Sequence, residues 1–99
     1  MLTMRDEILE RLAQNREALR HLGVRRLGLF GSVARGEEGE PRDLDFLVEF
    51  EVKTFDAYMD LKDFLEELFG RPVDLVLADA LKPALRQGIL AETVYAPGP

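Results

Sequence analysis

Two aspartates at alternate positions, Asp43 and Asp45, open one apolar stretch of the sequence, and Asp74 interrupts another. Alternate residues of a β-strand point to the same side, so the first two carboxylates are expected to lie together. Crowded carboxylates repel one another and retain protons unless a cation neutralises them. Oxygen ligands without histidine or cysteine suit Mg²⁺, which binds a few carboxylates, water and substrate phosphates. The three acids therefore predict a magnesium site, in which a pair of ions would activate an attacking oxygen and stabilise a leaving one.

A purely structural role for these aspartates remains open. Asp43 would then follow a turn, and Asp45 would pair with Arg35 or Arg42 at the surface. For a lone Asp-x-Asp motif this is the commoner outcome, because structural ion pairs also perturb carboxylates. Asp74 is harder to explain in this way, since a buried acid without a partner costs several kcal/mol. We therefore expect Asp74 to be buried and to face a specific partner.

A second motif lies upstream, where an apolar stretch ends in Gly31-Ser32. Glycine allows close approach of the backbone, and free N–H groups in such a turn form an anion-binding nest. A helical turn beginning there would add a favourable dipole, and the Ser32 hydroxyl and Arg35 would complete a grip on a triphosphate. Alone, Gly-Ser is more often a turn with a helix cap, and it is neither a P-loop nor a dinucleotide fingerprint. Together with the acids, which would hold the cation that phosphates share, it is far more specific.

Composition restricts the other possibilities. The chain has 99 residues, a net charge of −6, no cysteine and a single histidine, His21. We expect one domain over residues 1–99, without disulfides, thiolate metal sites or a Ser-His-Asp triad. The acidic balance argues against stable binding of nucleic acid. No apolar run would span a bilayer and no signal peptide is visible, so a cytoplasmic location is expected.

The spacing of apolar residues predicts alternating helices and strands. A first helix begins at Thr3, with Asp6 as its capping-box partner, and continues to Gly23. Strands are predicted at 24–30, 43–50, 73–78 and 93–95, a helical turn at 32–35, and helices at 55–69 and from 79 or 80 to about 90. The expected fold class is α/β (α+β), a small mixed β-sheet flanked by helices. Leu47, on the same side as the acids, indicates that only one end of that face is open.

The two motifs together resemble the minimal nucleotidyltransferase (MNT) family of the DNA polymerase β-like superfamily. The family pattern is Gly-Ser, ten residues, Asp-x-Asp and an acid on a later strand. Here Gly31-Ser32 is followed by residues 33–42, Asp43-Leu44-Asp45 and, later, Asp74. The ending Leu-Lys-Pro…Glu-Thr-Val-Tyr is also similar to that of the family, so the resemblance covers nearly the whole chain.

This resemblance implies binding of ATP with Mg²⁺ and transfer of AMP to a hydroxyl, with release of pyrophosphate. Gly31 and Ser32 would hold the β and γ phosphates, and Asp43 and Asp45 would hold the metal ions. Asp74 would bind the catalytic metal and help to deprotonate the attacking hydroxyl. Arg42 stands where the family commonly has serine, and would either assist phosphate binding or pair with Asp45.

The resemblance also implies a protein partner and a hetero-oligomer. Many MNT proteins are antitoxins of HEPN-domain RNase toxins and transfer AMP to a tyrosine of the toxin. The acidic surface favours such a protein partner over RNA. The alternative is a non-catalytic, nucleotide-binding antitoxin that neutralises its partner by forming a complex. Transfer to a small hydroxylated molecule, such as an aminoglycoside, is less expected, because 99 residues leave no room for an acceptor domain.

Overall fold

The computed structural model describes residues 2–37 and 43–96. Its strands are β1 (Val24–Phe30), β2 (Leu44–Phe50), β3 (Val73–Leu77) and β4 (Val94–Tyr95). Its helices are α1 (Met4–Gln14), α2 (Arg16–His21), α3 (Gly31–Ala34), α4 (Phe55–Phe69) and α5 (Pro83–Glu92), with a 3₁₀ turn at Ala78–Ala80. Within the described ranges, none of these helices is long and apolar enough to cross a membrane.

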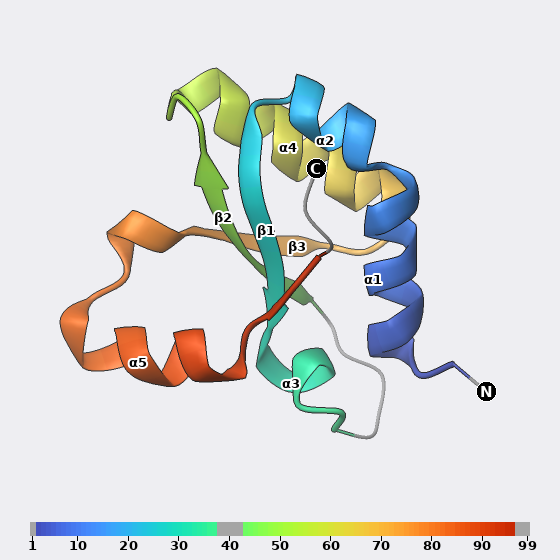
Figure 1. Cartoon of the computed structure of the whole chain (residues 1–99), viewed down its shortest axis with the longest axis vertical. Helices are drawn as coiled ribbons and strands as arrows, with labels where there is room; N and C mark the ends of the chain where they lie inside the picture. Colours follow the sequence, from blue (N-terminus) through green and yellow to red (C-terminus); the bar gives the residue numbers. More distant parts are fainter. Residues whose placement is uncertain (1, 38–42, 97–99) are drawn as a thin grey trace.

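The four strands form one sheet in the order β3-β2-β1-β4 (Figure 1). Strand β1 is antiparallel to both of its neighbours, whereas β2 and β3 run parallel. The parallel pair is connected through α4, because parallel strands need a long crossover. This mixed sheet with flanking helices confirms the predicted fold class.

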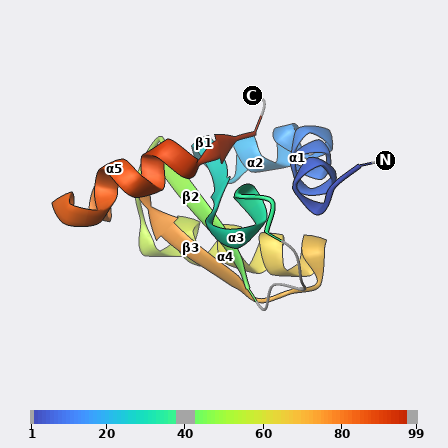
Figure 2. The same ribbon diagram turned by 90° about the horizontal axis from the view of Figure 1, so that it is seen from below.

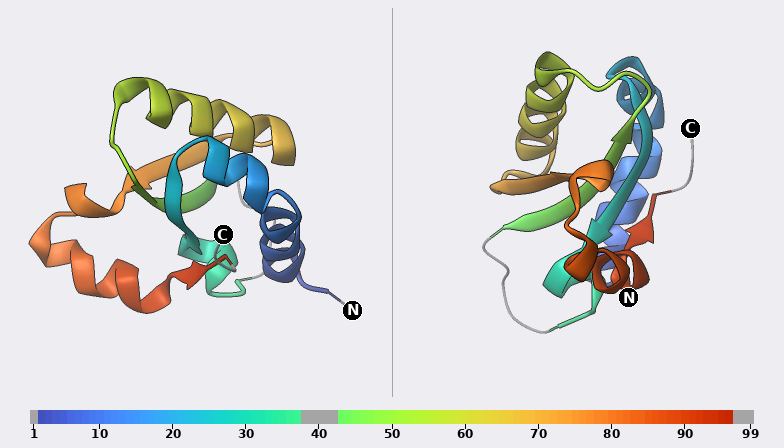
Figure 3. Two further views of the ribbon diagram at one scale, coloured as in Figure 1. Left: turned by 45° about the horizontal axis from the view of Figure 1, so that its top comes forward. Right: turned by 90° about the vertical axis from the view of Figure 1, so that its left-hand side faces the viewer.

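An apolar core fills the space between the sheet and helices α1, α2 and α4. Leu12, Leu19 and Leu61 from these helices pack in one cluster with Leu29 of β1 and Phe46 of β2. Helix α5 lies on the other side, and both views of Figure 3 show the sheet between α4 and α5. The two faces of the sheet are therefore covered by different helices, α1, α2 and α4 on one and α5 on the other.

Strand β2 has a fully buried face and a partly open one. Leu44, Phe46 and Val48 are at most 1% exposed, whereas Asp45 and Glu49 on the other face are half-buried. Leu47 lies between these two acids and is itself buried. The expectation that only one end of this face is open was therefore wrong, because Glu49 at the far end is half-buried in the same way as Asp45.

The first predicted helix is interrupted, and the expectation of a continuous helix was wrong. The capping box is present: the Asp6 N–H donates to Thr3 Oγ1 at 3.1 Å, and the Thr3 N–H donates to Asp6 Oδ2 at 3.3 Å. The helix stops at Asn15, whose side-chain Nδ2 donates to the Arg11 carbonyl oxygen at 2.8 Å. Asparagine side chains compete for backbone hydrogen bonds in this way and disfavour helix interiors. Gly23, with φ +85°, follows α2 as predicted.

The C-terminal segment also differs from its prediction. Ala78–Ala80 forms a 3₁₀ turn instead of continuing β3 or opening the last helix, and α5 begins only at Pro83 and reaches Glu92. Lys82 is extended, with ψ 139°, because proline disfavours the helical conformation in the residue before it. Proline then occupies the first turn of α5, where its missing N–H is tolerated. The short final strand is confirmed as β4.

Candidate active site

Gly31 joins β1 to α3 and lies directly against Asp45 of β2. The preceding residue, Phe30, is the antiparallel partner of Asp45 in the sheet. Gly31 is buried and has φ +78°, a conformation that favours glycine. A Cβ added there would overlap Asp45 Oδ2 and would lie 3.0 Å from Asp45 Cγ. The Gly-Ser motif and the Asp-x-Asp motif are therefore in contact.

Helix α3 is the short turn that follows this contact, and Figure 2 shows it beyond the end of β1, with α5 to one side. It begins one residue earlier than predicted, at Gly31. The Arg35 N–H donates to the Gly31 carbonyl at 3.1 Å, which closes the turn. Ser32 is half-buried in this first turn, next to the glycine that touches Asp45.

The acids come from two adjacent parallel strands. Asp45 and Asp74 are in register on β2 and β3, and such neighbours point to the same face, with the strands about 4.8 Å apart. Asp43 is exposed and immediately precedes β2. Burial, followed by the negative charges of Asp74 and Asp43, raises the pKa of Asp45 above its ordinary value. The other two aspartates therefore both act electrostatically on Asp45.

Asp74 does not occupy the environment that its apolar flanks predicted. It is exposed, and no charged side chain within residues 2–37 and 43–96 is buried. Strand β3 is at the edge of the sheet, and Asp74 lies on the face away from the apolar core. The expectation of a buried Asp74 was wrong, because the sequence does not specify that β3 lies at the edge.

Arg35, predicted to grip a triphosphate, is held by two glutamates. Its Nε lies 2.7 Å from Glu37 Oε2, and its Nη1 lies 2.6 Å from Glu92 Oε2 at the end of α5. The hydrogen bond to Glu37, followed by the one to Glu92, raises the pKa of Arg35 above its usual range. Sequence reasoning assigned no role to Glu92, which is 57 positions from Arg35 and was noted only as part of the Glu-Thr-Val-Tyr ending. The possible pairing of Asp45 with Arg42 lies outside the described residues.

The acids match Mg²⁺ in ligand type and charge. Asp45 is a crowded carboxylate with a raised pKa, and a divalent cation would relieve that repulsion. Within the described parts of the chain, no three acidic or histidine side chains form a group ready to hold an ion. Mg²⁺ usually takes only one or two carboxylates and completes its shell with water and substrate phosphates. Asp43, Asp45 and Asp74 are the residues that would hold it.

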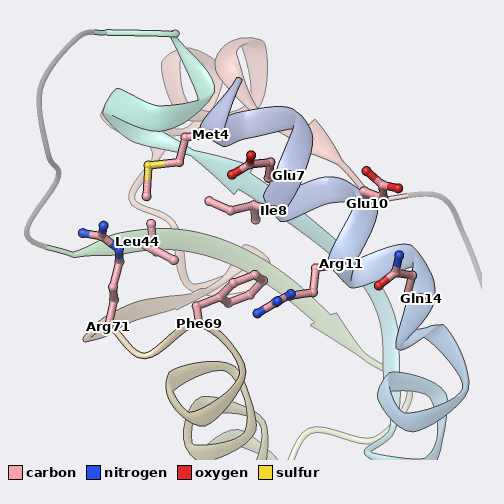
Figure 4. Close-up of a pocket in the computed structure, with 9 residues that line it drawn as sticks. All are labelled: Met4, Glu7, Ile8, Glu10, Arg11, Gln14, Leu44, Phe69 and Arg71. Atoms are coloured by element: carbon pink, nitrogen blue, oxygen red, sulfur yellow. The ribbon is translucent and has the colours of Figure 1, made fainter. Parts of the chain in front are cut away.

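A separate cavity lies away from these acids, between α1 and the end of α4 (Figure 4). Its volume is about 530 Å³. Arg11 of α1 lines the cavity and donates a hydrogen bond to the Leu68 carbonyl at 3.0 Å. Acidic and basic side chains from α1 face Phe69 and Arg71 across it. None of the aspartates considered above lines this cavity, so the residue chemistry, not the size of the cavity, identifies the candidate site.

Comparison with known proteins identifies the family. A model of the nucleotidyltransferase domain matches residues 6–96. The protein adenylyltransferase MntA of Thermococcus cleftensis is 41% identical over 97 residues, which cover 96% of this chain and 97% of that relative. A solved structure provisionally assigned as a minimal nucleotidyltransferase is 44% identical, has a TM-score of 0.70, and matches 87% of this chain and 93% of its own.

More distant solved structures share the fold. A toxin–antitoxin crystal structure with AMP-PNP has a TM-score of 0.65 at 22% identity, over 97% of this chain and 74% of that one. A complex of the tri-AMPylated HEPN toxin of Shewanella oneidensis with its MNT antitoxin has the same TM-score and the same coverage at 20% identity. The chain therefore belongs to the nucleotidyltransferase domain family, in its minimal (MNT) branch, as the sequence motifs predicted.

Proposed function

We propose that this chain transfers AMP from ATP, with Mg²⁺, to a tyrosine hydroxyl of a HEPN-domain RNase toxin and thereby acts as its antitoxin. The observation that carries this proposal is the contact between Gly31 and Asp45, which joins a phosphate-binding turn to an acid cluster. Support for a protein acceptor comes from the similarity to MntA, a protein adenylyltransferase. The AMPylated HEPN toxin found with an MNT antitoxin in a distant relative supports this class of partner.

The chain's own groups would mainly position the reactants. Backbone N–H groups of the turn at Gly31 and Ser32 would bind the β and γ phosphates. The acceptor oxygen would then form a bond to the α-phosphorus as the bond from that phosphorus to the bridging oxygen breaks, releasing pyrophosphate. Asp74 would accept the hydroxyl proton. Mg²⁺ held by Asp43, Asp45 and Asp74 would neutralise the phosphate charge.

Intact-mass spectrometry of the HEPN-domain partner tests this proposal directly. The partner would be incubated with ATP, Mg²⁺ and either the wild-type chain or Asp45→Asn. We expect a gain in steps of one AMP with the wild type and almost none with the variant, since the substitution removes one carboxylate ligand. Transfer by Asp45→Asn near the wild-type rate would overturn the mechanism, provided that circular dichroism shows both chains folded.

The engagement of Arg35 keeps a non-catalytic antitoxin as the second candidate. With its guanidinium on Glu37 and Glu92, Arg35 does not contribute to a phosphate grip in this conformation. A chain of this kind would inhibit the RNase by covering it. An RNase assay of the partner beside the mass measurement distinguishes the two: inhibition without ATP and without a mass gain, preserved in Asp43→Asn, would establish inhibition by complex formation alone.

A further inference from the structure

A basic crevice lies on the face of the sheet beneath α5, towards the end away from Asp45. It is a cavity of about 440 Å³, bounded by the ends of β1, β2 and β3, by α5 and by Tyr95 of β4. Its charged lining residues are the cations Arg25, Arg26, Lys53 and Arg86 and the acids Glu49 and Asp79. Cations thus outnumber acids here, although the whole chain has a net charge of −6. Positive charge is therefore concentrated at one place on an acidic protein.

An irregularity in β1 places two consecutive arginines in this crevice. Val24 pairs with Phe50 and Arg26 with Glu49, so Arg25 is an extra residue with no partner across the strands. In a regular strand, consecutive side chains point to opposite faces, yet Arg25 and Arg26 both line the crevice. Val24 stays in the apolar core, where it is 4% exposed. The β-bulge therefore redirects Arg25 towards the crevice, as bulges next to functional sites often do.

Within the described part of the chain, two of these four cations have internal partners. Arg26 is 3.5 Å from Glu49, with its guanidinium carbon 3.9 Å from the centre of the Tyr95 ring, and Lys53 is 3.0 Å from Asp79. Over residues 2–37 and 43–96, the side chains of Arg25 and Arg86 make no hydrogen bond or ion pair. Two guanidinium groups, one from β1 and one from α5, therefore line the same cavity without an ion-pair partner among the described residues.

We propose that the basic crevice binds the phosphate of a nucleotide, at a site separate from Gly31 and Asp45. Guanidinium groups bind phosphate through paired, charge-assisted hydrogen bonds. Leu90 of α5 offers apolar contact for a base or ribose, and the cavity is within the size range of small-ligand sites. The two sites are distinct, because Asp45 and Glu49 of β2 are about 13 Å apart at the usual rise of a strand.

The ligand would be either a free mononucleotide or a nucleotide already linked to another molecule through a phosphodiester. Both carry the same adenylate phosphate, and the chain's own transfer activity is not required for either to bind. AMP represents the first source, and the dinucleotide adenylyl-adenosine represents the second. Shifts at the crevice with AMP alone would assign the site to the free nucleotide, whereas shifts with adenylyl-adenosine would assign it to the linked form.

Nuclear magnetic resonance of the ¹⁵N-labelled full chain provides the test. AMP and adenylyl-adenosine would be titrated separately in EDTA, so that divalent cations do not recruit them to the acids. We expect shifts of the Arg25 and Arg86 side-chain Nε–H signals. In the double variant Arg25→Gln/Arg86→Gln, the affinity for the nucleotide should fall roughly tenfold or more relative to the wild type. The matched control is Arg16→Gln/Arg20→Gln, which removes the same charge from exposed positions of α2 and should leave binding unchanged.

Four results would overturn the proposal. The first is a set of shifts confined to the turn at Gly31 and Ser32, and the second is equal binding by the crevice variant and its control. The third is binding of adenosine as tight as that of AMP, which would remove the role of the phosphate. The fourth is a shift of the crevice signals by an oligo-glutamate peptide but by neither nucleotide, which would assign the site to an acidic protein segment. Because none of these readouts uses AMP transfer, failure here is distinguishable from failure of the proposed function.

Discussion

The Arg35 guanidinium connects the turn at Gly31 to the C-terminal helix, because its Nη1 lies 2.6 Å from Glu92 Oε2. Arg35 immediately follows α3, and Glu92 is the last residue of α5. The pair is partly solvent-exposed, with Arg35 46% and Glu92 22% accessible. A triphosphate bound at the turn would therefore compete with Glu92 for this cation.

Removing the competing carboxylate should favour nucleotide binding. We expect Glu92→Gln to lower the KM for ATP roughly two- to fivefold, the range typical of exposed ion pairs. Steady-state measurement of AMP transfer would check this value. Glu67→Gln, a substitution of the same kind at an exposed position of α4, should leave the KM unchanged. In an Arg35→Gln background the effect of Glu92→Gln should disappear; its persistence there would show that Glu92 acts in some other way.

The contact of Gly31 with Asp45 predicts a steric cost that another glycine does not share. Gly31→Ala should destabilise the fold by about 1–3 kcal/mol and reduce transfer, since the new methyl group must displace the Asp45 carboxylate. Gly36 has a similar φ of +73° but nothing within 4 Å of an added Cβ, so Gly36→Ala reports backbone strain alone. Chemical denaturation would compare them. Equal losses would show that contact with Asp45 adds nothing.

Asp45 should make stability depend on pH. Its pKa is raised in the fold, so the native chain holds this proton more tightly than the unfolded chain does. The resulting stabilisation is complete below the ordinary value of 3.8 and is lost as pH rises through the native pKa. Without Mg²⁺ or nucleotide, Asp45→Asn should therefore raise the Tm at about pH 7, with a gain that shrinks as the solution is acidified.

Thermal denaturation followed by circular dichroism would measure this pH dependence. Asp63→Asn removes the same charge from an exposed position of α4 and serves as the control. A gain that is equal in both variants at every pH would mean that net charge, and not the crowding of Asp45, is responsible.

Magnesium should stabilise the wild-type chain through the same carboxylate. At a concentration about 100 times its Kd, an ion that binds only the folded state adds about 2.7 kcal/mol. The accompanying rise in Tm should be largely absent from Asp45→Asn, and chelation of Mg²⁺ should abolish transfer by the wild type. An unchanged Mg²⁺-dependent rise in the variant would place the ion elsewhere.

Tyr58 links α4 to β3, and its hydroxyl donates to the Leu75 carbonyl at 2.7 Å. Tyr58→Phe should lower the free energy of unfolding by about 1 kcal/mol, because it leaves that carbonyl without its partner. Tyr95→Phe is the matched control, since the Tyr95 hydroxyl makes no hydrogen bond in the described part of the chain. Urea titrations with equal m-values would compare the two variants. Equal losses would indicate a general effect of removing a hydroxyl.

Helix caps and the alternation of apolar residues correctly predicted the elements whose ends and faces depend on residues close in sequence. Helix α4 runs between its predicted ends because Thr54 caps it, with its hydroxyl 3.0 Å from the Ala57 N–H, and Gly70 terminates it with φ +64°. The alternation in β2 predicted its buried and open faces. The Gly-Ser and Asp-x-Asp motifs also pointed to one place, and Gly31 does lie against Asp45. The chemical roles assigned to these residues remain predictions.

The features that were missed depend on contacts between distant parts of the chain. The apolar positions Leu12 and Leu19 continue across Asn15, so spacing alone did not reveal the break between α1 and α2. An apolar strand has the same composition whether it lies at the centre or the edge of a sheet, which is why the exposure of Asp74 was not foreseen. The partners of Arg35 likewise emerge only once α5 is placed beside α3.

Helix α4 also affects how this protein meets other chains, through its contacts with β3. Among the strands that the structure describes, β3 pairs with β2 alone, and in a parallel ladder every second residue turns its backbone groups away from that neighbour. Two of those groups are occupied: Glu66 Oε2 accepts from the Val73 N–H at 2.9 Å, and Tyr58 donates to the Leu75 carbonyl. Unpaired strand edges are where chains aggregate by adding strands to one another. By occupying these groups, α4 opposes the addition of further strands to this edge. Another protein would then bind here through side-chain contacts instead of backbone pairing.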